Sequence, residues 1–243
     1  MTMLGFTGVG KSFADGTTAL ADIDFDVAAG EFVSVVGPSG CGKTSLLRIA
    51  AGLSTASEGT VRRATERVGY VFQDPTLLPW RTVQSNVELL AELRHLPKQE
   101  RRRRAEEAIE LVGLSDFAGH RPGQLSGGMR MRVSLARSLT VEPELFLFDE
   151  PFGALDEITR QRLGDELLRL FRLRGFAGLM VTHSVTEAVY LSTRVLVLSG
   201  RPGRVIGDFA VPFGHPRSPE LRFEDDFTHL AGKISACLRG GAG

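Results

Sequence analysis

The stretch Gly37-Pro38-Ser39-Gly40-Cys41-Gly42-Lys43-Thr44 has the residue types and spacing of a loop that binds the phosphates of a nucleotide. Its glycines let the main chain curl so that backbone N–H groups converge on an anion, and the helix that follows adds the positive end of its dipole. In this arrangement Lys43 reaches the β- and γ-phosphates, and the Thr44 hydroxyl ligates Mg²⁺. The alternative is a chance glycine-rich turn.

The flanks of this phosphate loop (residues 37–44) favour the nucleotide interpretation. Glu31–Val36 is β-branched and apolar, which is typical of a buried strand. Ser45–Ala51 has the pattern of a helix, and Gly52 ends it. Strand, loop and helix therefore follow one another in the required order.

The composition sets limits on the protein class. Lysine plus arginine and aspartate plus glutamate balance at 29 each, so no net charge attracts nucleic acid or an anionic membrane, and we expect no nucleic-acid partner. No apolar run approaches the length of a membrane span, and no secretory signal is evident at the start. The two cysteines form no disulfide framework and suit a reducing cytoplasm. Cys41 is either a redox-sensitive thiol or, as we favour, a small residue that fits a crowded turn.

Acidic residues end a second buried strand. Leu145–Phe148 is apolar and leads directly into Asp149 and Glu150, an adjacent pair that is costly to bury unless a cation or water chemistry uses it. We expect Asp149 to hold Mg²⁺ and Glu150 to polarise the water that attacks the γ-phosphate. His183 ends the predicted strand Gly178–Thr182, where a contact with the γ-phosphate is favoured over a structural histidine.

A second glycine pair opens another predicted helix. Ser126 is placed to cap a helix that runs to about Leu139, and Gly127 with Gly128 offers bare amides to an anion at its start. One nucleotide cannot easily reach both this segment and the phosphate loop of the same compact chain. A second copy of the chain can supply it.

Three further segments leave alternatives open. Phe13 can stack on a nucleotide base or belong to the core. Gln73 follows the predicted strand Arg67–Phe72 and offers an uncharged carbonyl to Mg²⁺ or water, and the apolar segment after it, with the single Trp80, is either a partner groove or core. The run Arg101–Arg104 lies on a predicted helix with Glu106 and Glu107, and we interpret it as a solvated, ion-paired face.

Taken together, these motifs resemble the ATP-binding subunit of an ABC transporter. The resemblance covers about Leu4 to Val205 and rests on the phosphate loop, Gln73, the segment Leu125–Gly128, the Asp149–Glu150 pair, Ala154–Asp156 and His183, which occur in the family's order. The glycine segment, the family's signature, is the most specific of these elements.

The resemblance implies a set of site residues. The nucleotide would contact Phe13, the phosphate loop (Gly37, Pro38, Ser39, Gly40, Cys41, Gly42, Lys43, Thr44), Ser45 and, from a partner chain, Ser126, Gly127 and Gly128. Thr44, Gln73 and Asp149 would hold Mg²⁺. Glu150, His183 and Gln73 would act in hydrolysis. The cofactors implied are therefore ATP and Mg²⁺.

A narrower resemblance is to importers of the nitrate, sulfonate and taurine type. It rests on Leu77–Arg81, on Met129–Arg130 and on Ser199–Val205. In that subfamily the segment after the glutamine shapes the groove that receives the permease. The resemblance therefore favours a partner groove over a core role for the segment that carries Trp80. Met131 and Ser184 depart from the common pattern, but neither position touches phosphate chemistry.

We therefore predict an α/β fold: a RecA-like P-loop NTPase core with an antiparallel β subdomain and an α-helical subdomain. Residues 1–205 would form the ATPase domain, with the helical subdomain at about 75–140. Residues 206–243 would be a short packing tail whose end, residues 240–243, is disordered.

The predicted function is ATP hydrolysis by a homodimer that drives uptake of a small solute through a separate permease, fed by a periplasmic or lipid-anchored binding protein. The predicted location is the cytoplasmic face of the cell membrane, as a peripheral protein. A soluble, non-transport ABC ATPase is the main alternative, and a small-molecule kinase that uses only the phosphate loop is the third.

Overall fold

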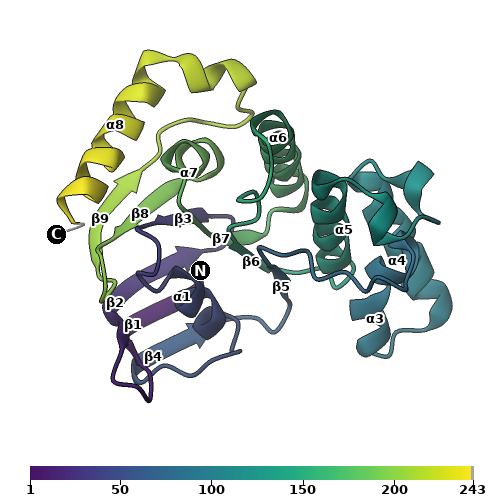
Figure 1. Cartoon of the computed structure of the whole chain (residues 1–243), viewed down its shortest axis with the longest axis horizontal. Coiled ribbons are helices and arrows are strands. Elements are labelled where there is room, and N and C mark those ends of the chain that lie inside the picture. The colour runs from purple at the N-terminus through teal and green to yellow at the C-terminus, as the bar shows by residue number, and fades with distance from the viewer. Residues whose placement is uncertain (242–243) are drawn as a thin grey trace.

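The computed structural model describes residues 1–241, and Figure 1 shows their arrangement. The strands are β1 (Thr2–Ser12), β2 (Thr18–Ala28), β3 (Phe32–Val36), β4 (Glu58–Arg63), β5 (Val68–Val71), β6 (Leu145–Asp149), β7 (Ala177–Thr182), β8 (Arg194–Leu198) and β9 (Val205–Ala210). The α-helices are α1 (Lys43–Ala50), α2 (Val83–Val87), α3 (Leu89–Leu93), α4 (Lys98–Leu111), α5 (Gly127–Leu139), α6 (Glu157–Arg174), α7 (Val185–Leu191) and α8 (Asp225–Gly240). Short 3₁₀ turns lie at Ser115–Phe117, Pro122–Gln124 and Pro219–Phe223.

The central sheet has the strand order β5-β6-β7-β3-β8-β9. Its first five strands are parallel, and β9 runs antiparallel to β8. Because β3, β6 and β7 are buried along their whole length, their sequences are continuous apolar runs. The carboxyl ends of these three strands lead into the phosphate loop, Glu150 and His183, so the sheet gathers three predicted site segments at one edge.

A second sheet, of order β2-β1-β4, is antiparallel throughout. The β1–β2 hairpin has the predicted turn at Asp15–Gly16. The residues Ser57–Gly59 are of the types typical of a turn, but Glu58 and Gly59 belong to strand β4, which is paired with β1. Gly59 adopts φ +74°, and a Cβ there would lie 2.2 Å from the Gly8 carbonyl oxygen, so this glycine permits close strand contact.

The side chains of the central sheet alternate between two hydrophobic layers. Val33, Leu147 and Leu179 point toward α1 and the antiparallel sheet. Phe32, Phe148 and Met180 point the other way, toward α6, α7 and α8. Figure 1 shows α7 and α8 over one face of the sheet and α1 between the two sheets. The predicted α/β architecture is thereby confirmed.

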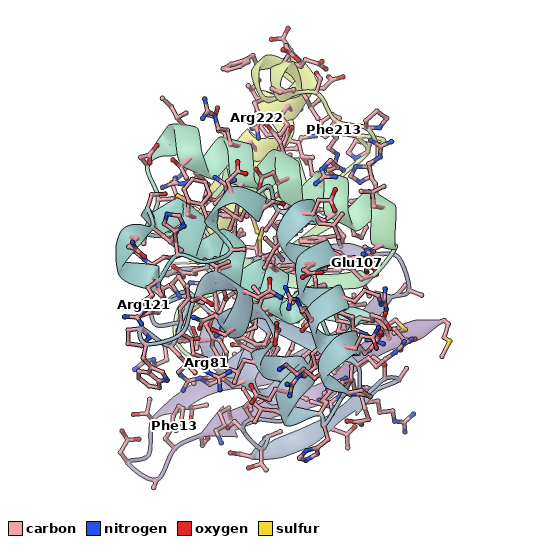
Figure 2. The ribbon with its side chains drawn as sticks, turned by 90° about the vertical axis from the view of Figure 1, so that its right-hand side faces the viewer. Phe13, Arg81, Glu107, Arg121, Phe213 and Arg222 are labelled. Carbon is pink, nitrogen blue, oxygen red and sulfur yellow. The ribbon has the colours of Figure 1, made fainter. Side chains whose placement is uncertain are left out.

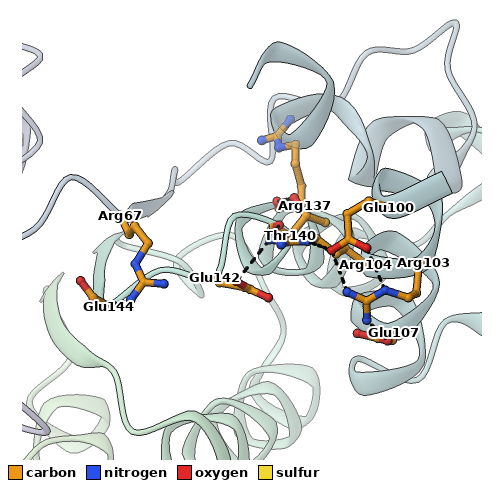
Figure 3. Close-up of polar contacts among 9 residues, drawn as sticks. All are labelled: Arg67, Glu100, Arg103, Arg104, Glu107, Arg137, Thr140, Glu142 and Glu144. Carbon is orange, nitrogen blue, oxygen red and sulfur yellow. Dashed lines mark hydrogen bonds and ion pairs between the residues drawn. The ribbon is translucent and has the colours of Figure 1, made fainter. Parts of the chain in front are cut away.

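Helices α2 to α5 lie between β5 and β6 in the chain and form the group at the right of Figure 1. The apolar spacing of Val83–Leu96 is typical of one amphipathic helix, but the structure divides this segment into α2 and α3, and Pro97 precedes α4. Of the run Arg101–Arg104, the last three arginines form ion pairs as predicted, whereas no ion pair of Arg101 is found among residues 1–241. For example, Arg103 pairs with Glu100 and Glu107, and Arg104 pairs with Glu100 and with Glu142 near the start of β6 (Figure 3).

Arg137 connects α5 to the chain just after Gln73. This buried guanidinium donates hydrogen bonds to the carbonyl oxygens of Pro75 (2.9 Å) and Thr76 (3.0 Å) and to the Thr76 hydroxyl (3.1 Å). Burial lowers the pKa of Arg137. These bonds satisfy a charge that would otherwise be expensive to bury, so helix and segment are firmly joined.

The C-terminal part is more integrated than a loose tail. Strand β9 belongs to the central sheet, so the core extends beyond the expected boundary at residue 205. Arg217 donates to the carbonyl oxygens of Val189, Tyr190 and Phe213 and fixes the segment on α7. Gly240 ends α8 and the Gly241 carbonyl accepts a hydrogen bond from the Gly200 amide, which corrects the predicted disorder at these two residues. Residues 242–243 lie outside the described part.

Candidate nucleotide site

The phosphate loop connects β3 to α1 with the main chain curled as predicted. Gly40 and Gly42 adopt φ values of +78° and +105°, which residues with a Cβ rarely adopt. A Cβ on Gly42 would also lie 2.7 Å from the Ala19 carbonyl oxygen. The Lys43 side chain is 5% exposed and donates to the carbonyl oxygens of Gly37 (2.8 Å) and Pro38 (2.9 Å), so its ammonium is held against the loop.

Thr44 and Asp149 meet at the edge of the sheet. The Thr44 hydroxyl donates to Asp149 Oδ1 (3.0 Å), and the Tyr70 hydroxyl donates to Oδ2 (3.1 Å). Asp149 is 6% exposed, and burial raises its pKa, an effect that the bonds from Thr44 and Tyr70 oppose. A buried carboxylate beside a hydroxyl oxygen is a donor pair that suits Mg²⁺, and a cation there would offset the cost of burial.

Glu150 has an unusual backbone conformation and a defined partner. Its φ of +44° is left-handed, which is costly for a residue with a Cβ and frequent at functional sites. Glu150 Oε2 lies 3.1 Å from His183 Nδ1, and Oε1 lies 3.9 Å from Lys43 Nζ. Gln73 is near, because a Cβ on Gly153 would lie 3.6 Å from Glu150 Oε2 and 3.8 Å from Gln73 Nε2.

A pocket of about 270 Å³ lies over the phosphate loop. Phe13 lines it from the end of β1 with 47% of its surface exposed, as an aromatic platform requires. Figure 2 shows Phe13 at the hairpin end of the molecule, opposite the C-terminal segment that carries Arg222. The pocket is lined by Phe13, Thr17, Ala19, Ser39, Gly40, Gly42, Lys43, Thr44, Ser45, Glu150 and Arg201.

The signature segment lies outside this pocket. Ser126 caps α5, its side chain accepting a hydrogen bond from the Met129 amide (3.3 Å). A Cβ on Gly128 would lie 2.5 Å from Thr159 Cγ2, so Gly128 packs tightly against the first turn of α6. Ser126 itself is exposed. The structure therefore places Ser126 at the surface, Gly127 half-buried and Gly128 buried against α6, and none of the three lines the nucleotide pocket of their own chain.

The other predicted residues divide into two groups. Gly37, Pro38 and Cys41 are not among the residues that line the pocket but support the loop from behind: Cys41 is 1% exposed, and its Sγ would lie 2.7 Å from a Cβ on Gly37. Burial raises the pKa of the Cys41 thiol, which suits packing better than reactivity. Gln73, Asp149 and His183 border the Glu150 side of the site through the contacts described above.

Sequence reasoning missed Tyr70 as a partner of Asp149 and Arg201 as a pocket residue. Tyr70 is an ordinary strand residue by pattern, and Arg201 lies in the segment 199–205 that served only to suggest a subfamily. Their contacts come from β5–β6 pairing and from the turn after β8, both long-range features.

Another cavity, of about 400 Å³, lies at the opposite edge of the central sheet, at the starts of β6 and β7. It is lined by Arg67, Arg104, Glu107, Glu142 and Glu144 among others, and Figure 3 shows several of their ion pairs. None of the predicted site residues lines it. The predicted chemistry is therefore confined to the carboxyl edge.

The sequence profile described as ABC transporter matches residues 20–153. This match spans more than half of the chain, and it includes the phosphate loop, the signature and the Asp149–Glu150 pair. The chain belongs to the ABC transporter family, as an ATP-hydrolysing cassette.

The chain is similar to ATP-binding proteins of two import systems and to a cassette of known structure. The chain is 44% identical over 220 residues to the taurine import ATP-binding protein TauB of Yersinia pestis, covering 87% of this chain and 86% of the relative. It is 47% identical over 207 residues to the aliphatic sulfonates import ATP-binding protein SsuB 1 of Pseudomonas syringae, covering 85% of each. It is also similar to a bacterial ABC transporter cassette solved as a dimer, with 32% identity, a TM-score of 0.77 and coverage of 87% of this chain and 100% of the other.

Proposed function

We propose that this chain is the ATP-hydrolysing subunit of an importer that takes up a small solute, such as nitrate, a sulfonate or taurine, through a separate permease. The observation that carries this proposal is the similarity along most of the chain to ATP-binding proteins of taurine and aliphatic sulfonate import. Among residues 1–241, no helix is both long and apolar enough to cross a bilayer. In the proposed importer the membrane-spanning part is a separate permease, and this chain is bound to it at the cytoplasmic face.

In the proposed reaction the loop amides and Lys43 bind the β- and γ-phosphates, and Phe13 stacks on the base. Glu150, as a carboxylate, accepts a proton from the attacking water, while His183 Nδ1–H donates to Oε2 and orients the carboxylate. Gln73, which lies beside Gly153 and Glu150, is placed to respond to the γ-phosphate.

Thr44 and Asp149, with Gln73, would hold Mg²⁺. A bound Mg²⁺ would neutralise charge that develops on the phosphate oxygens. Among residues 1–241, no cluster of three or more His, Cys, Asp or Glu side chains could hold a metal, so phosphate and water oxygens would complete the coordination.

The proposed active unit is a homodimer. The nucleotide pocket has no lining residue from Ser126–Gly128, yet Gly127 and Gly128 are the first residues of α5, whose amides have no acceptor within the helix. A head-to-tail pair would place the signature of one chain over the phosphate loop of the other. The dimeric form of the similar cassette supports this arrangement.

The proposed permease contact is the segment that carries Trp80. Trp80 is 69% exposed, whereas the neighbouring Asn86 is completely buried. The Asn86 side chain accepts from the Leu78 amide (2.8 Å) and donates to the carbonyl oxygens of Leu78, Arg81 and Thr82. An exposed indole on a loop fixed from inside is suited to a protein partner.

A mild-detergent pull-down from native membranes tests the importer. We expect a multi-span permease to co-purify with the wild-type chain and to be lost with Trp80→Glu. Leu53→Glu is the matched control, because Leu53 is exposed to a similar extent (63%) but lies after α1. Recovery of soluble partners alone, with the chain absent from membranes, would reject the importer and favour the soluble ATPase.

A further inference from the structure

The turn between β8 and β9, residues 199–204, has a fixed shape. The Ser199 amide donates to the Arg204 carbonyl oxygen (2.9 Å), and the Arg204 amide donates to Ser199 Oγ (3.0 Å). The Ser199 hydroxyl lies 2.9 Å from the carbonyl oxygens of both Gly200 and Pro202. One serine thus organises the turn, and the position of Arg201 at its tip is defined.

This turn is wedged between β2 and the phosphate loop. The Gly203 amide donates to the Ala19 carbonyl oxygen (2.9 Å), and the Ala21 amide donates to the Gly203 carbonyl oxygen (3.0 Å). A Cβ on Gly203 would lie 2.3 Å from the Cys41 carbonyl oxygen, so only glycine allows this approach. The turn therefore touches both the strand that borders the base platform and the loop that binds phosphate.

Arg201 extends from the turn into the nucleotide pocket. Its Nε (3.1 Å) and Nη2 (2.9 Å) donate to the Gly40 carbonyl oxygen, and it lines the same pocket as Phe13 and Lys43. A guanidinium has five N–H donors, and those two bonds are the only ones that Arg201 makes within residues 1–241. No carboxylate within that range forms an ion pair with it.

The positive charge of Arg201 contributes to the pKa values of two groups near the pocket, Asp15 and Cys41. The pKa of Asp15, in the turn beside Phe13, is lowered chiefly by hydrogen bonds from Thr17, with a smaller contribution from Arg201. The positive charge of Arg201 also partly opposes the effect of burial on the Cys41 thiol in the phosphate loop. These contributions agree with the position of Arg201 in the pocket that Phe13 and Lys43 also line.

We propose that Arg201 is a further nucleotide-binding residue, whose guanidinium is anchored on the Gly40 carbonyl and presents its remaining N–H donors to a phosphate of ATP. The inference rests on the proposed placement of ATP over the phosphate loop. Planar guanidinium groups are well suited to phosphate oxygens, and anchoring the side chain in advance reduces the entropy lost on binding. Arg201 would thus add a second cation, besides Lys43, to the pocket.

The test compares ATP binding by calorimetry for wild type, Arg201→Ala, Arg201→Gln and Arg201→Lys. We expect the Kd for ATP to rise about tenfold in the alanine and glutamine variants, the loss expected for one charge-assisted hydrogen bond. The lysine variant keeps the charge but lacks the fork, so its Kd should rise by about threefold. Arg204→Ala is the matched control, because Arg204 lies in the same turn but faces Asp22 at 3.7 Å, and its Kd should stay within about twofold of wild type.

Salt dependence separates a phosphate contact from mere support of the loop. If Arg201 binds phosphate, the Kd of Arg201→Ala will depend less on salt concentration than that of wild type, because one charge attraction is missing. The proposal would be overturned if the Kd of Arg201→Ala for ATP equals that of wild type. It would also be overturned if that Kd is higher than the wild-type Kd but changes with salt concentration as the wild-type Kd does. Lys43→Ala is measured in parallel: wild-type ATP binding by that variant would reject the proposed nucleotide site itself, a result distinct from failure of Arg201 alone.

Discussion

The phosphate loop and the signature segment both place glycines at the start of a helix, but their surroundings differ. Around the phosphate loop, Lys43 and Asp149 are buried. Lys43 donates to the Gly37 carbonyl oxygen, and the exposed Thr44 donates its hydroxyl to Asp149. At the signature, Ser126 is exposed, and among residues 1–241 its side chain bonds only to the Met129 amide of its own helix. The first region is organised before any ligand arrives, whereas the second is a presented surface.

This difference indicates that the phosphate loop and the signature segment have different roles. Preorganised groups lose little entropy when the ligand binds, so the phosphate loop is suited to hold ATP in a single chain. An exposed helix start is suited to be covered by something else, and the proposed dimer provides the occupant. Four predictions test this contrast, beginning with the largest effect.

Glu150→Gln should lower the rate of ATP hydrolysis by about 10²- to 10⁴-fold, the usual contribution of a general base, while ATP affinity stays near wild type. Phosphate release measures the first quantity and calorimetry the second, and gel filtration with ATP should show a stable dimer. Glu157→Gln is the control, because Glu157 lies at the start of α6 and lines no part of the nucleotide pocket. Unchanged hydrolysis in Glu150→Gln would contradict the role of Glu150 as the base.

Mixing two inactive variants should restore activity if the two regions act across a dimer. Lys43→Ala damages the phosphate loop and Ser126→Arg blocks the signature, so a mixed dimer keeps one intact pair of regions. An equimolar mixture should recover about one quarter of wild-type hydrolysis, since about half of the dimers are mixed and each has one working site. If hydrolysis in the mixture is no greater than the sum of the separate variants, the two regions do not meet in trans.

Asp149→Asn should increase stability without nucleotide while removing hydrolysis. Burial raises the pKa of Asp149 in the folded state, so its ionisation disfavours folding as pH rises through that pKa. The Tm of the variant should therefore exceed that of wild type at pH 7, and the gain should shrink as pH falls toward about 4, the ordinary carboxyl range.

Thermal unfolding as a function of pH measures this effect. Glu106→Gln is the control, since Glu106 is exposed and pairs only with Arg102 on α4, and its Tm should not depend on pH in this way. A lower Tm for Asp149→Asn at pH 7 would mean that the carboxylate stabilises the chain even without a cation.

Ser126→Ala should have the smallest effect on the fold, costing about 1 kcal/mol through loss of the helix cap. For a chain of this size the Tm should fall by about 2–4 °C. Ser126→Asn can replace the cap, so it should restore the Tm. If both variants unfold as wild type does, the Ser126 side chain contributes nothing to α5 and serves the partner alone.

Features that depend on local sequence could be predicted. The phosphate loop needs glycines at fixed positions, and the cap at Ser126 is a short-range hydrogen bond, so both were predicted from spacing. The acidic end of β6 and His183 at the end of β7 follow from strand patterns alone. Their assembly at one edge then follows from the parallel sheet.

Features that depend on distant partners could not be predicted. Glu58–Arg63 has a weak strand pattern and becomes a strand only by pairing with β1, while β9 needs β8. Tyr70 and Arg201 gain their contacts with Asp149 and Gly40 from pairings across 79 and 161 residues. Propensity and periodicity carry no information on such contacts.

The hydrogen bonds of Arg137 fix the last turn of α5 to the segment that follows Gln73. This helix of 13 residues is about 20 Å long, and its first turn carries the signature while Arg137 in its last turn grips Pro75 and Thr76, just beyond Gln73. A stiff rod cannot absorb a displacement at one end. In the proposed dimer, a movement of the Gln73 segment would therefore displace the signature, which is the surface that would face the partner chain.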